Sequence, residues 1–306
     1  MTPDGELPAP GTTRFDDRVA IITGAGRGIG RAIAVLMASR GAKVVVNDLG
    51  TTLEGATTNV DVATAVVDEI VEVGGEAVAS NASAATTVGA ETMVRTALDA
   101  FGRIDILVNN AGIMRDGPFL EMDEAAWDDV IAVNLRAAFC CTHAAARLMA
   151  DQGYGRVVNM SSISAFGQSG IASEMVGRAN YSAAKAGLLG LTWSLAGELS
   201  SYGITCNAVM PTATTRLMLA ARERRAAAGI ETPPEGIIER DPEDAAHLVA
   251  SLASEAAAQT NGRVFWIDRG RICLYDPPIP TMTLDKRGRW NLDELVAELG
   301  AVTPRT

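Results

Sequence analysis

The chain has 306 residues, of which 48% are hydrophobic, 21% charged and 5% aromatic, a composition typical of a globular protein. Its 26 Lys and Arg residues and 37 Asp and Glu residues give a net charge of −11, which disfavours nucleic acid or an anionic membrane as the main partner. No apolar run approaches the length of a membrane span, and residues 1–14 resemble a flexible segment rather than a secretory signal. We therefore expect a cytoplasmic protein.

The cysteines and histidines argue against another class of site. The four cysteines show no CxxC or zinc spacing, so buried thiols in a reducing cytosol are expected. The chain has only two histidines, His143 and His247. We predict no metal site and no histidine-based triad.

The first elements form a βαβ pattern. A β-branched run at 19–22 leads into TGAGRGIG, a helical pattern over 31–40 and a second strand over 43–47. Glycines in such a turn let the backbone approach a pyrophosphate, whose charge faces the N–H groups that begin the helix. The spacing is GxxxGxG rather than GxGxxG, and tight turns alone explain many glycine clusters. The loop residues expected to hold a dinucleotide are Gly24, Arg27, Gly28, Ile29 and Gly30.

Asp48 ends the second strand, 18 positions beyond Gly30. A carboxylate at this place accepts hydrogen bonds from the adenosine ribose and repels a 2′-phosphate, which favours NAD over NADP. Arg27 indicates the opposite, because it could pair with that phosphate. We give Asp48 more weight, because a long Arg side chain can swing into water. The alternative for Asp48 is a solvated strand-end residue.

Helices and strands continue to alternate along the chain. After a loop at 50–62, helices are expected over 63–73, 88–101, 124–151, 181–201 and 244–254, and strands over 76–79, 105–108, 157–160, 205–209 and, last, 262–268. This alternation predicts an α/β fold with a three-layer, doubly wound parallel sheet, a Rossmann fold, in one domain over 15–275. Ligands of such sheets bind beyond the carboxyl ends of the strands, where Thr23, Asp48 and Asn109 lie.

Two segments depart from the alternation. Residues 212–241 mix a helical piece with Gly and paired Pro, and we expect a lid over the substrate. Its arginines could pair with CoA phosphates or simply form a solvated face; they are Arg222, Arg224 and Arg225. Residues 276–306 form a C-terminal extension with a helix near 292–299, which covers a neighbour's active site or packs on its own subunit.

Tyr181 and Lys185 are a candidate acid/base pair. Four residues apart in a helix, they lie on one face, one turn from each other. Free tyrosine has a pKa of about 10, and a nearby ammonium lowers that pKa toward the range useful for general acid/base catalysis. An ordinary amphipathic helix has the same spacing.

Together these motifs resemble the short-chain dehydrogenase/reductase family. The similarity runs in order through TGxxxGxG at 23–30, NNAG at 109–112, the helical Asn134, the strand-end Ser162 and YxxxK at 181–185. The stretches 44–50, 96–116 and 180–191 are similar to the dehydrogenase domain of the peroxisomal multifunctional enzyme type 2 group. That group oxidises (3R)-hydroxyacyl-CoA and some 17β-hydroxysteroids with NAD.

The resemblance implies an NAD-dependent oxidoreductase that interconverts a small-molecule secondary alcohol and a ketone, with a 3-hydroxyacyl-CoA or a hydroxysteroid as substrate. It implies Tyr181 as the general base in oxidation, with Lys185 lowering its pKa and holding the nicotinamide ribose. Ser162, rather than Ser161, would bond the substrate oxygen, and Asn134 would anchor a water that links Lys185 to solvent. Cofactor contacts are also implied for Asn110, Ala111, Gly112 and Pro211.

Four departures from the family pattern limit what the resemblance says about substrate. Ser162 and Tyr181 are 19 positions apart rather than about thirteen, and the extra residues lie within 167–178. Thr212 replaces the usual Gly after Pro211, Ala82 replaces an Asp that touches adenine, and the tail has no counterpart in the minimal family.

Two further readings of the function stay open from the sequence. One is an NADPH-dependent 3-oxoacyl reductase that runs in the opposite direction, and another is a dinucleotide-sensing protein without turnover. The resemblance also implies a homotetramer, formed through the helices that carry Asn134 and Tyr181. A small-residue face suits such packing, although core burial explains it equally well; it comprises Ala137, Ala144, Leu188 and Leu195.

Overall fold

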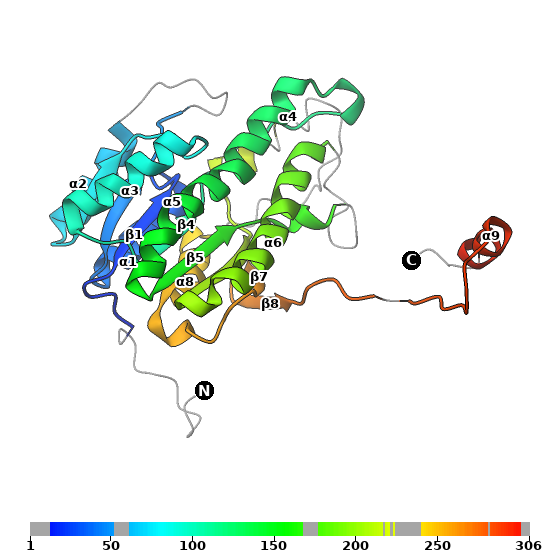
Figure 1. Cartoon of the computed structure of the whole chain (residues 1–306). Helices are drawn as coiled ribbons and strands as arrows, with labels where there is room; N and C mark the ends of the chain where they lie inside the picture. The colour runs from blue at the N-terminus through cyan, green and yellow to red at the C-terminus, as the bar shows by residue number, and fades with distance from the viewer. Residues whose placement is uncertain are drawn as a thin grey trace. The chain divides into compact units, whose positions relative to one another are not determined.

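The computed structural model describes residues 13–51, 61–167, 177–216, 218–220, 223, 240–280 and 282–300. The chain divides into two compact units, Met1–Tyr275 and Asp276–Thr306 (Figure 1). The expectation of a flexible 1–14 falls mostly outside the described residues, as do residues 52–60 of the expected loop and most of the expected lid at 212–241.

In the first unit the described residues form one sheet of eight strands in the order β3-β2-β1-β4-β5-β6-β7-β8. The strands are β1 (Val19–Thr23), β2 (Lys43–Asn47), β3 (Glu76–Ser80), β4 (Ile106–Asn109), β5 (Gly155–Met160), β6 (Ile204–Pro211), β7 (Val264–Asp268) and β8 (Arg271–Tyr275). Strands β1 to β7 are parallel, with Ile21 opposite Val45 of β2 and Leu107 of β4. The central strands are buried on both faces, which explains why most of their residues are apolar without an alternation of polar positions.

Helices cover both faces of this sheet (Figure 1). One core lies beneath α1 (Gly28–Ser39), α2 (Asp61–Glu72) and α8 (Pro242–Ala253). The other lies beneath α3 (Thr87–Phe101), α5 (Ala137–Gln152) and α6 (Ala179–Leu199). Successive residues of β1 alternate between the two cores, with Ala20 and Ile22 in the first and Val19 and Ile21 in the second. The three-layer, doubly wound Rossmann fold is confirmed.

Local signals set the limits of several helices. Helix α3 begins where the Thr86 hydroxyl accepts a 3.1 Å bond from the Gly89 N–H, and it ends at Gly102, whose φ of 77° is left-handed. Helix α4 (Glu124–Ile131) is capped in the same way by Asp123. The shorter helical turns are Phe119–Glu121, Ile163–Phe166, Ser200–Tyr202 and Glu255–Ala257, and α9 (Leu292–Gly300) lies in the second unit.

Two details differ from the sequence prediction. The helix expected over 124–151 is interrupted by a π-helical turn, Ala132–Arg136, between α4 and α5. The strand over 262–268 is not the last, because β8 follows and pairs antiparallel with β7. Its turn is Arg269-Gly270, with Arg269 at a φ of 53°, instead of an Asn-Gly or Asp-Gly pair, and its side chains lack a clear alternation. The sequence therefore carried little signal for this hairpin.

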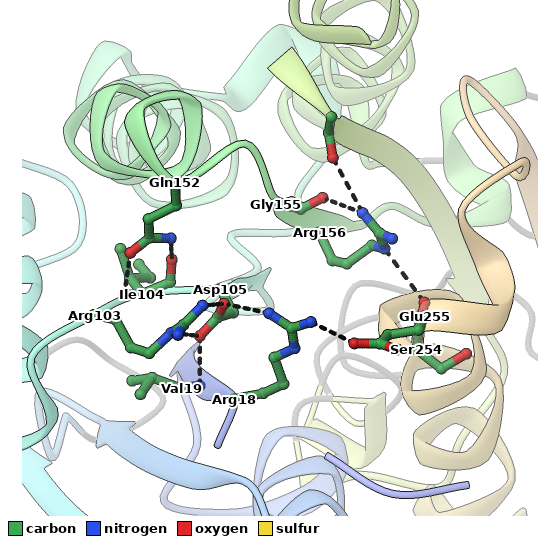
Figure 2. Close-up of polar contacts among 11 residues, drawn as sticks. Arg18, Val19, Arg103, Ile104, Asp105, Gln152, Gly155, Arg156, Ser254 and Glu255 are labelled. Carbon is green, nitrogen blue, oxygen red and sulfur yellow. Dashed lines mark hydrogen bonds and ion pairs between the residues drawn. The ribbon is translucent and has the colours of Figure 1, made fainter. Parts of the chain in front are cut away.

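Figure 2 shows an ion-pair network at the amino-terminal edge of the sheet. The fully buried Asp105 accepts bonds from Arg18 at 3.0 Å, from Arg103 at 2.7 and 2.8 Å and from the Val19 N–H at 3.0 Å. Arg18 also bonds Glu255, at the carboxyl end of α8. The network thus links β1 and the start of β4 to the segment after α8.

None of the helices in the described part of the chain combines the length and apolarity that a bilayer span needs.

Candidate active site

The opposite edge of the sheet, where the parallel strands end, carries most of the predicted site residues. Here the glycine loop joins β1 to α1 and lies against the loop after β4. Gly24 has a φ of 63°, and a Cβ on it would lie 2.9 Å from the Cα of Ala111. A Cβ on Gly30 would lie 2.3 Å from the Gly24 carbonyl oxygen. Side chains at these two positions would clash with backbone, so the turn requires glycine there.

Asn110 holds this loop in place. Its side-chain amide donates to the carbonyls of Thr23 and Gly24 at 2.9 and 3.0 Å. The Thr23 hydroxyl in turn accepts bonds of 3.0 Å from the N–H groups of Asn110 and Ala111. These bonds join the NNAG segment to the glycine loop, a link that the separate motifs did not reveal.

The Asp48 carboxylate lies beside the glycine loop. It accepts bonds from the Gly26 N–H at 3.0 Å and from the Gly50 N–H at 2.8 Å. Arg27 is the residue before α1, and its side chain makes no cap bond. The N–H groups at the positive end of that helix are therefore not capped by this side chain and can face an anion. A loop that requires glycine at its closest backbone contacts, a helix amino terminus and an acidic residue at the second strand fit a dinucleotide.

Helix α6, which covers the other face of the sheet from α1, carries Tyr181 and Lys185 to the same carboxyl-terminal edge. The Ser162 side chain lies beside the Tyr181 phenol and acts to lower its pKa. The Lys185 ammonium donates a 2.7 Å bond to the Met160 carbonyl and lies 5.4 Å from the centre of the Tyr181 ring. The structure therefore brings these three side chains together from the turn after β5 and from α6.

Asn134 completes the group from the π-helical turn. Its amide donates to the carbonyls of Val130 and Ile113 at 3.0 and 2.9 Å. Its buried Oδ1 has no partner among the described residues, and a Cβ on Gly112 would lie 2.7 Å from it and 3.7 Å from the Lys185 ammonium. A buried acceptor without a donor is costly, so this oxygen fits a water beside Lys185.

The two neighbouring serines have different surroundings. Ser161 is buried, and its hydroxyl donates to the Lys185 carbonyl at 2.8 Å. The Ser162 hydroxyl instead donates to the Ser164 hydroxyl at 3.2 Å, accepts from the Ser164 N–H at 3.2 Å and lies beside Tyr181. Ser161 therefore anchors α6, while Ser162 is the one that can reach a substrate.

The pKa values of the pair differ from the expectation that Lys185 lowers the pKa of Tyr181. Burial raises the pKa of Tyr181 to about 12, against the opposing effects of the Arg178 guanidinium and the Ser162 hydrogen bond. Burial lowers the pKa of Lys185, which is 4% exposed, to about 7. The expectation was wrong for the protein alone, because the loss of water around each group is the largest cause of its shift.

Three residues near this group were missed by the sequence analysis. Asn180 is fully buried, and its Oδ1 accepts a 2.7 Å bond from the Tyr181 N–H. Arg178 and Asp116 form an ion pair beside Tyr181. Their only sequence signal is proximity to the NNAG and YxxxK motifs.

The segment after β6 also approaches the cofactor edge. Pro211 pairs with Ile267 of β7, and the Thr212 N–H donates to the Ile267 carbonyl at 2.9 Å. A Cβ on Gly28 would lie 3.6 Å from the Thr215 side chain, so this segment passes over the start of α1. Most of the residues inserted between Ser162 and Tyr181, 168–176, lie outside the described residues. So do the lid arginines, Arg222, Arg224 and Arg225.

Groups of three or more His, Cys, Asp or Glu that could hold a metal do not occur in the described ranges. The four cysteines are free thiols, and Cys140, Cys141 and Cys206 are buried.

The sequence profile of the short chain dehydrogenase family matches residues 18–226. The chain belongs to this family of oxidoreductases. Short-chain dehydrogenases bind nicotinamide dinucleotides, in agreement with the glycine loop and Asp48 at the sheet edge.

Similar proteins place the chain within the short-chain dehydrogenase family. It is 47% identical over 207 residues to the peroxisomal multifunctional enzyme type 2 of Drosophila melanogaster, covering 68% of this chain and 33% of that one. It is 38% identical over 301 residues to the hydroxyacyl-CoA dehydrogenase ChsB1 of Mycobacterium tuberculosis, covering 94% and 89%. The chain spans about a third or less of the multifunctional relatives.

A crystal structure of a short chain dehydrogenase from Mycobacterium avium has the same fold. Its TM-score is 0.78 at 40% sequence identity, covering 95% of this chain and 97% of that chain.

Proposed function

We propose that the protein is an NAD-dependent dehydrogenase that oxidises the secondary hydroxyl of a 3-hydroxyacyl-CoA to a ketone. The observation that carries the proposal is the Tyr181 phenol beside the Ser162 side chain and adjacent to Lys185, at the edge where the glycine loop fits a dinucleotide. When bound, NAD accepts the hydride from the carbinol carbon.

The residues of the chain supply the proton chemistry. Ser162 donates to the substrate oxygen and orients the hydroxyl toward Tyr181, which takes its proton as the hydride leaves. Because burial raises the pKa of Tyr181 to about 12, the phenol is protonated at neutral pH in the protein alone and must lose its own proton before it takes that of the substrate. The same phenol is ready to donate in the reducing direction, and the oxidation rate rises with pH.

Lys185 and Asn134 connect the site to solvent. The Lys185 ammonium has a pKa lowered to about 7, so it exchanges a proton readily near neutral pH. A water on the unpaired Asn134 Oδ1 would carry that proton outward.

The choice of NAD over NADP is supported by Asp48. Its carboxylate lies within 3.0 Å of the Gly26 N–H, where it accepts ribose hydroxyls and repels a 2′-phosphate. The opposite preference, expected for an NADPH-dependent 3-oxoacyl reductase, depends on Arg27 alone. Titration of the protein with NADH and NADPH separates the two, and tighter NADPH binding would contradict the role of Asp48.

The acyl-CoA substrate is supported by the similarity to a hydroxyacyl-CoA dehydrogenase over 94% of this chain. The test is a screen with NAD across (3R)- and (3S)-hydroxyacyl-CoA thioesters and 17β-hydroxysteroids, compared by kcat/KM. A clear preference for one thioester enantiomer is expected. Turnover of steroids alone would change the substrate, and no turnover with NAD still bound would favour the dinucleotide sensor.

A homotetramer is supported by a groove of about 600 Å³ between α5 and α6, lined by Phe139, His143 and Leu195 among others. Phe139 is 53% exposed, and its ring stacks on His143 at 5.6 Å. Of the face expected from sequence, Ala137 and Leu188 are buried in the subunit and cannot contact a partner. Light scattering tests the assembly, and Phe139→Asp is expected to dissociate it.

A cytoplasmic location is supported by the four free thiols, which suit a reducing compartment. Fractionation of the source cells tests it.

A further inference from the structure

A buried ion pair joins the loop after β4 to the start of α6. The Arg178 Nε donates a 3.1 Å bond to the Asp116 carboxylate, and the two side chains are 14% and 2% exposed. Neither residue belongs to the proposed catalytic set. Ion pairs this well buried fix geometry strongly, because removal of one partner leaves the other charge buried without compensation.

Backbone bonds reinforce the same junction. The Gly117 N–H, next to Asp116, donates to the Gly177 carbonyl at 2.9 Å. On the helix side, the Arg178 carbonyl accepts a 2.8 Å bond from the Ser182 N–H, one of the first bonds of α6. The ion pair is therefore anchored in the turn that carries Tyr181.

Asn180 makes the third connection. Its side-chain amide donates to the carbonyls of Arg115 and Ala126 at 3.1 and 3.0 Å, and its Oδ1 accepts from the Tyr181 N–H at 2.7 Å. The loop after β4, the start of α4 and the backbone of Tyr181 thus form one rigid contact. A shift of the loop would move the phenol relative to Ser162.

The pair also places two charges near the phenol. The Arg178 guanidinium lowers the pKa of Tyr181, against the larger effect of burial, whereas the Asp116 carboxylate raises it, in the same direction as burial. The other charged groups nearby are Lys185 on the same helix and the Arg115–Asp129 pair at 3.8 Å. Tyr181 therefore experiences two opposite charges from this ion pair, and a substitution of either residue changes their sum.

We propose that Arg178 and Asp116 are positioning residues for Tyr181, which hold the first turn of α6 against the loop after β4 and set the charge that the phenol experiences. The proposal builds on the dehydrogenase function above. The pair has two roles, positional and electrostatic, that can be tested separately. The position of the first turn of α6 depends on both residues together, whereas their two charges act on the phenol in opposite directions.

The test compares Arg178→Gln with Asp116→Asn by the pH dependence of kcat/KM for oxidation. Loss of the guanidinium should move the limb of the profile on which the rate rises with pH to higher pH. Loss of the carboxylate should move the same limb to lower pH. A displacement of about one pH unit changes the rate on that limb about tenfold. Arg178→Lys keeps the charge and should retain most of the wild-type profile.

The matched control is Arg14→Gln, which removes an arginine from the exposed Arg14–Asp16 pair and should leave the profile unchanged. Thermal unfolding of each variant reports folding. Should Arg178→Gln fail to fold, Arg178→Lys and Asp116→Asn carry the comparison, with the limb unmoved in the first and lowered in the second.

Ultraviolet titration of the Tyr181 phenol, taken as the difference from Tyr181→Phe, gives a readout that does not depend on turnover. If the wild type oxidises no alcohol, the proposed function fails, yet opposite displacements of this titration would still support the positioning role. Displacements in the same direction, or none in either variant, would overturn it.

Discussion

The two edges of one sheet use buried polar groups in opposite ways. At the amino-terminal edge the carboxylate of Asp105 is fully buried and receives four hydrogen bonds, from Arg18, Arg103 and Val19. At the carboxyl-terminal edge Lys185 is almost as buried, yet its ammonium bonds only one carbonyl, and the Asn134 Oδ1 has no partner in the described residues. The first arrangement stabilises the fold, whereas the second leaves groups ready for water, cofactor and substrate.

The contrast is one of degree, because the amino-terminal edge also holds an unpaired group. The Tyr154 hydroxyl is buried without a partner in the described residues, and burial raises its pKa. The guanidinium carbons of Arg18 and Arg156, however, lie 3.8 and 4.3 Å from the centre of its ring. Those cation–π contacts stabilise the Tyr154 ring in its buried position. Both arginines also make hydrogen bonds elsewhere.

The largest effect should come from Tyr181→Phe. Loss of the phenolic hydroxyl should reduce kcat by about 10²-fold to 10⁴-fold or more, because no other side chain in the described part of the site is placed to take the proton. The dissociation constant of NAD and the unfolding temperature should stay close to wild type. Steady-state kinetics with calorimetry measure all three, and a variant that turns over at the wild-type rate would remove the proposed chemistry.

Asp105→Asn should do the reverse, lowering stability and leaving chemistry intact. Two arginines lose their buried carboxylate, so the free energy of unfolding should fall by about 3–5 kcal/mol. Urea denaturation measures it, while kcat of the folded fraction should stay unchanged. Asp16→Asn, in an exposed pair with Arg14, is the control and should have no measurable effect. A loss of kcat in Asp105→Asn would mean that the edges are coupled.

Lys185 should impose a pH dependence on stability. Its pKa is about 7 in the folded protein and 10.5 as the reference, so between these values the unfolded chain binds more protons. The free energy of unfolding should therefore rise with pH from about 7 toward 10, by up to about 1.4 kcal/mol per pH unit. Tyr181 contributes the opposite slope above pH 10, since its pKa is raised to about 12.

Urea midpoints at pH 7 and pH 9, each without cofactor, give that slope. The variant Lys185→Met should flatten it, while leaving the contribution of the Asp105 network in place. A wild-type curve that is already flat would show that the ammonium is better solvated than its burial indicates.

The smallest effect concerns the cofactor. Asp48→Asn keeps the size of the side chain and removes the charge that would face a 2′-phosphate. The ratio of kcat/KM for NAD to that for NADP should fall about tenfold, equivalent to about 1.4 kcal/mol. An unchanged ratio would mean that Asp48 serves only its bonds to Gly26 and Gly50.

The order of elements and the fold class could be predicted from sequence because they depend on local periodicity. The limits of β2, expected at 43–47, agree with the structure, and the glycine loop was found because a turn against backbone tolerates no side chain. The antiparallel β8 escaped prediction, since its pairing with β7 is a tertiary contact and its Arg269-Gly270 turn is not a common hairpin signal.

Chain order alone identified the family, the residue types at the sheet edge and the spacing of Tyr181 and Lys185, because each is a property of neighbours in sequence. The direction of their pKa shifts was decided by the tertiary structure, since desolvation depends on how completely the remaining chain encloses each group. The same holds for the Arg178–Asp116 pair and for the different surroundings of Ser161 and Ser162, which are set by contacts between residues that are distant in sequence or on different faces.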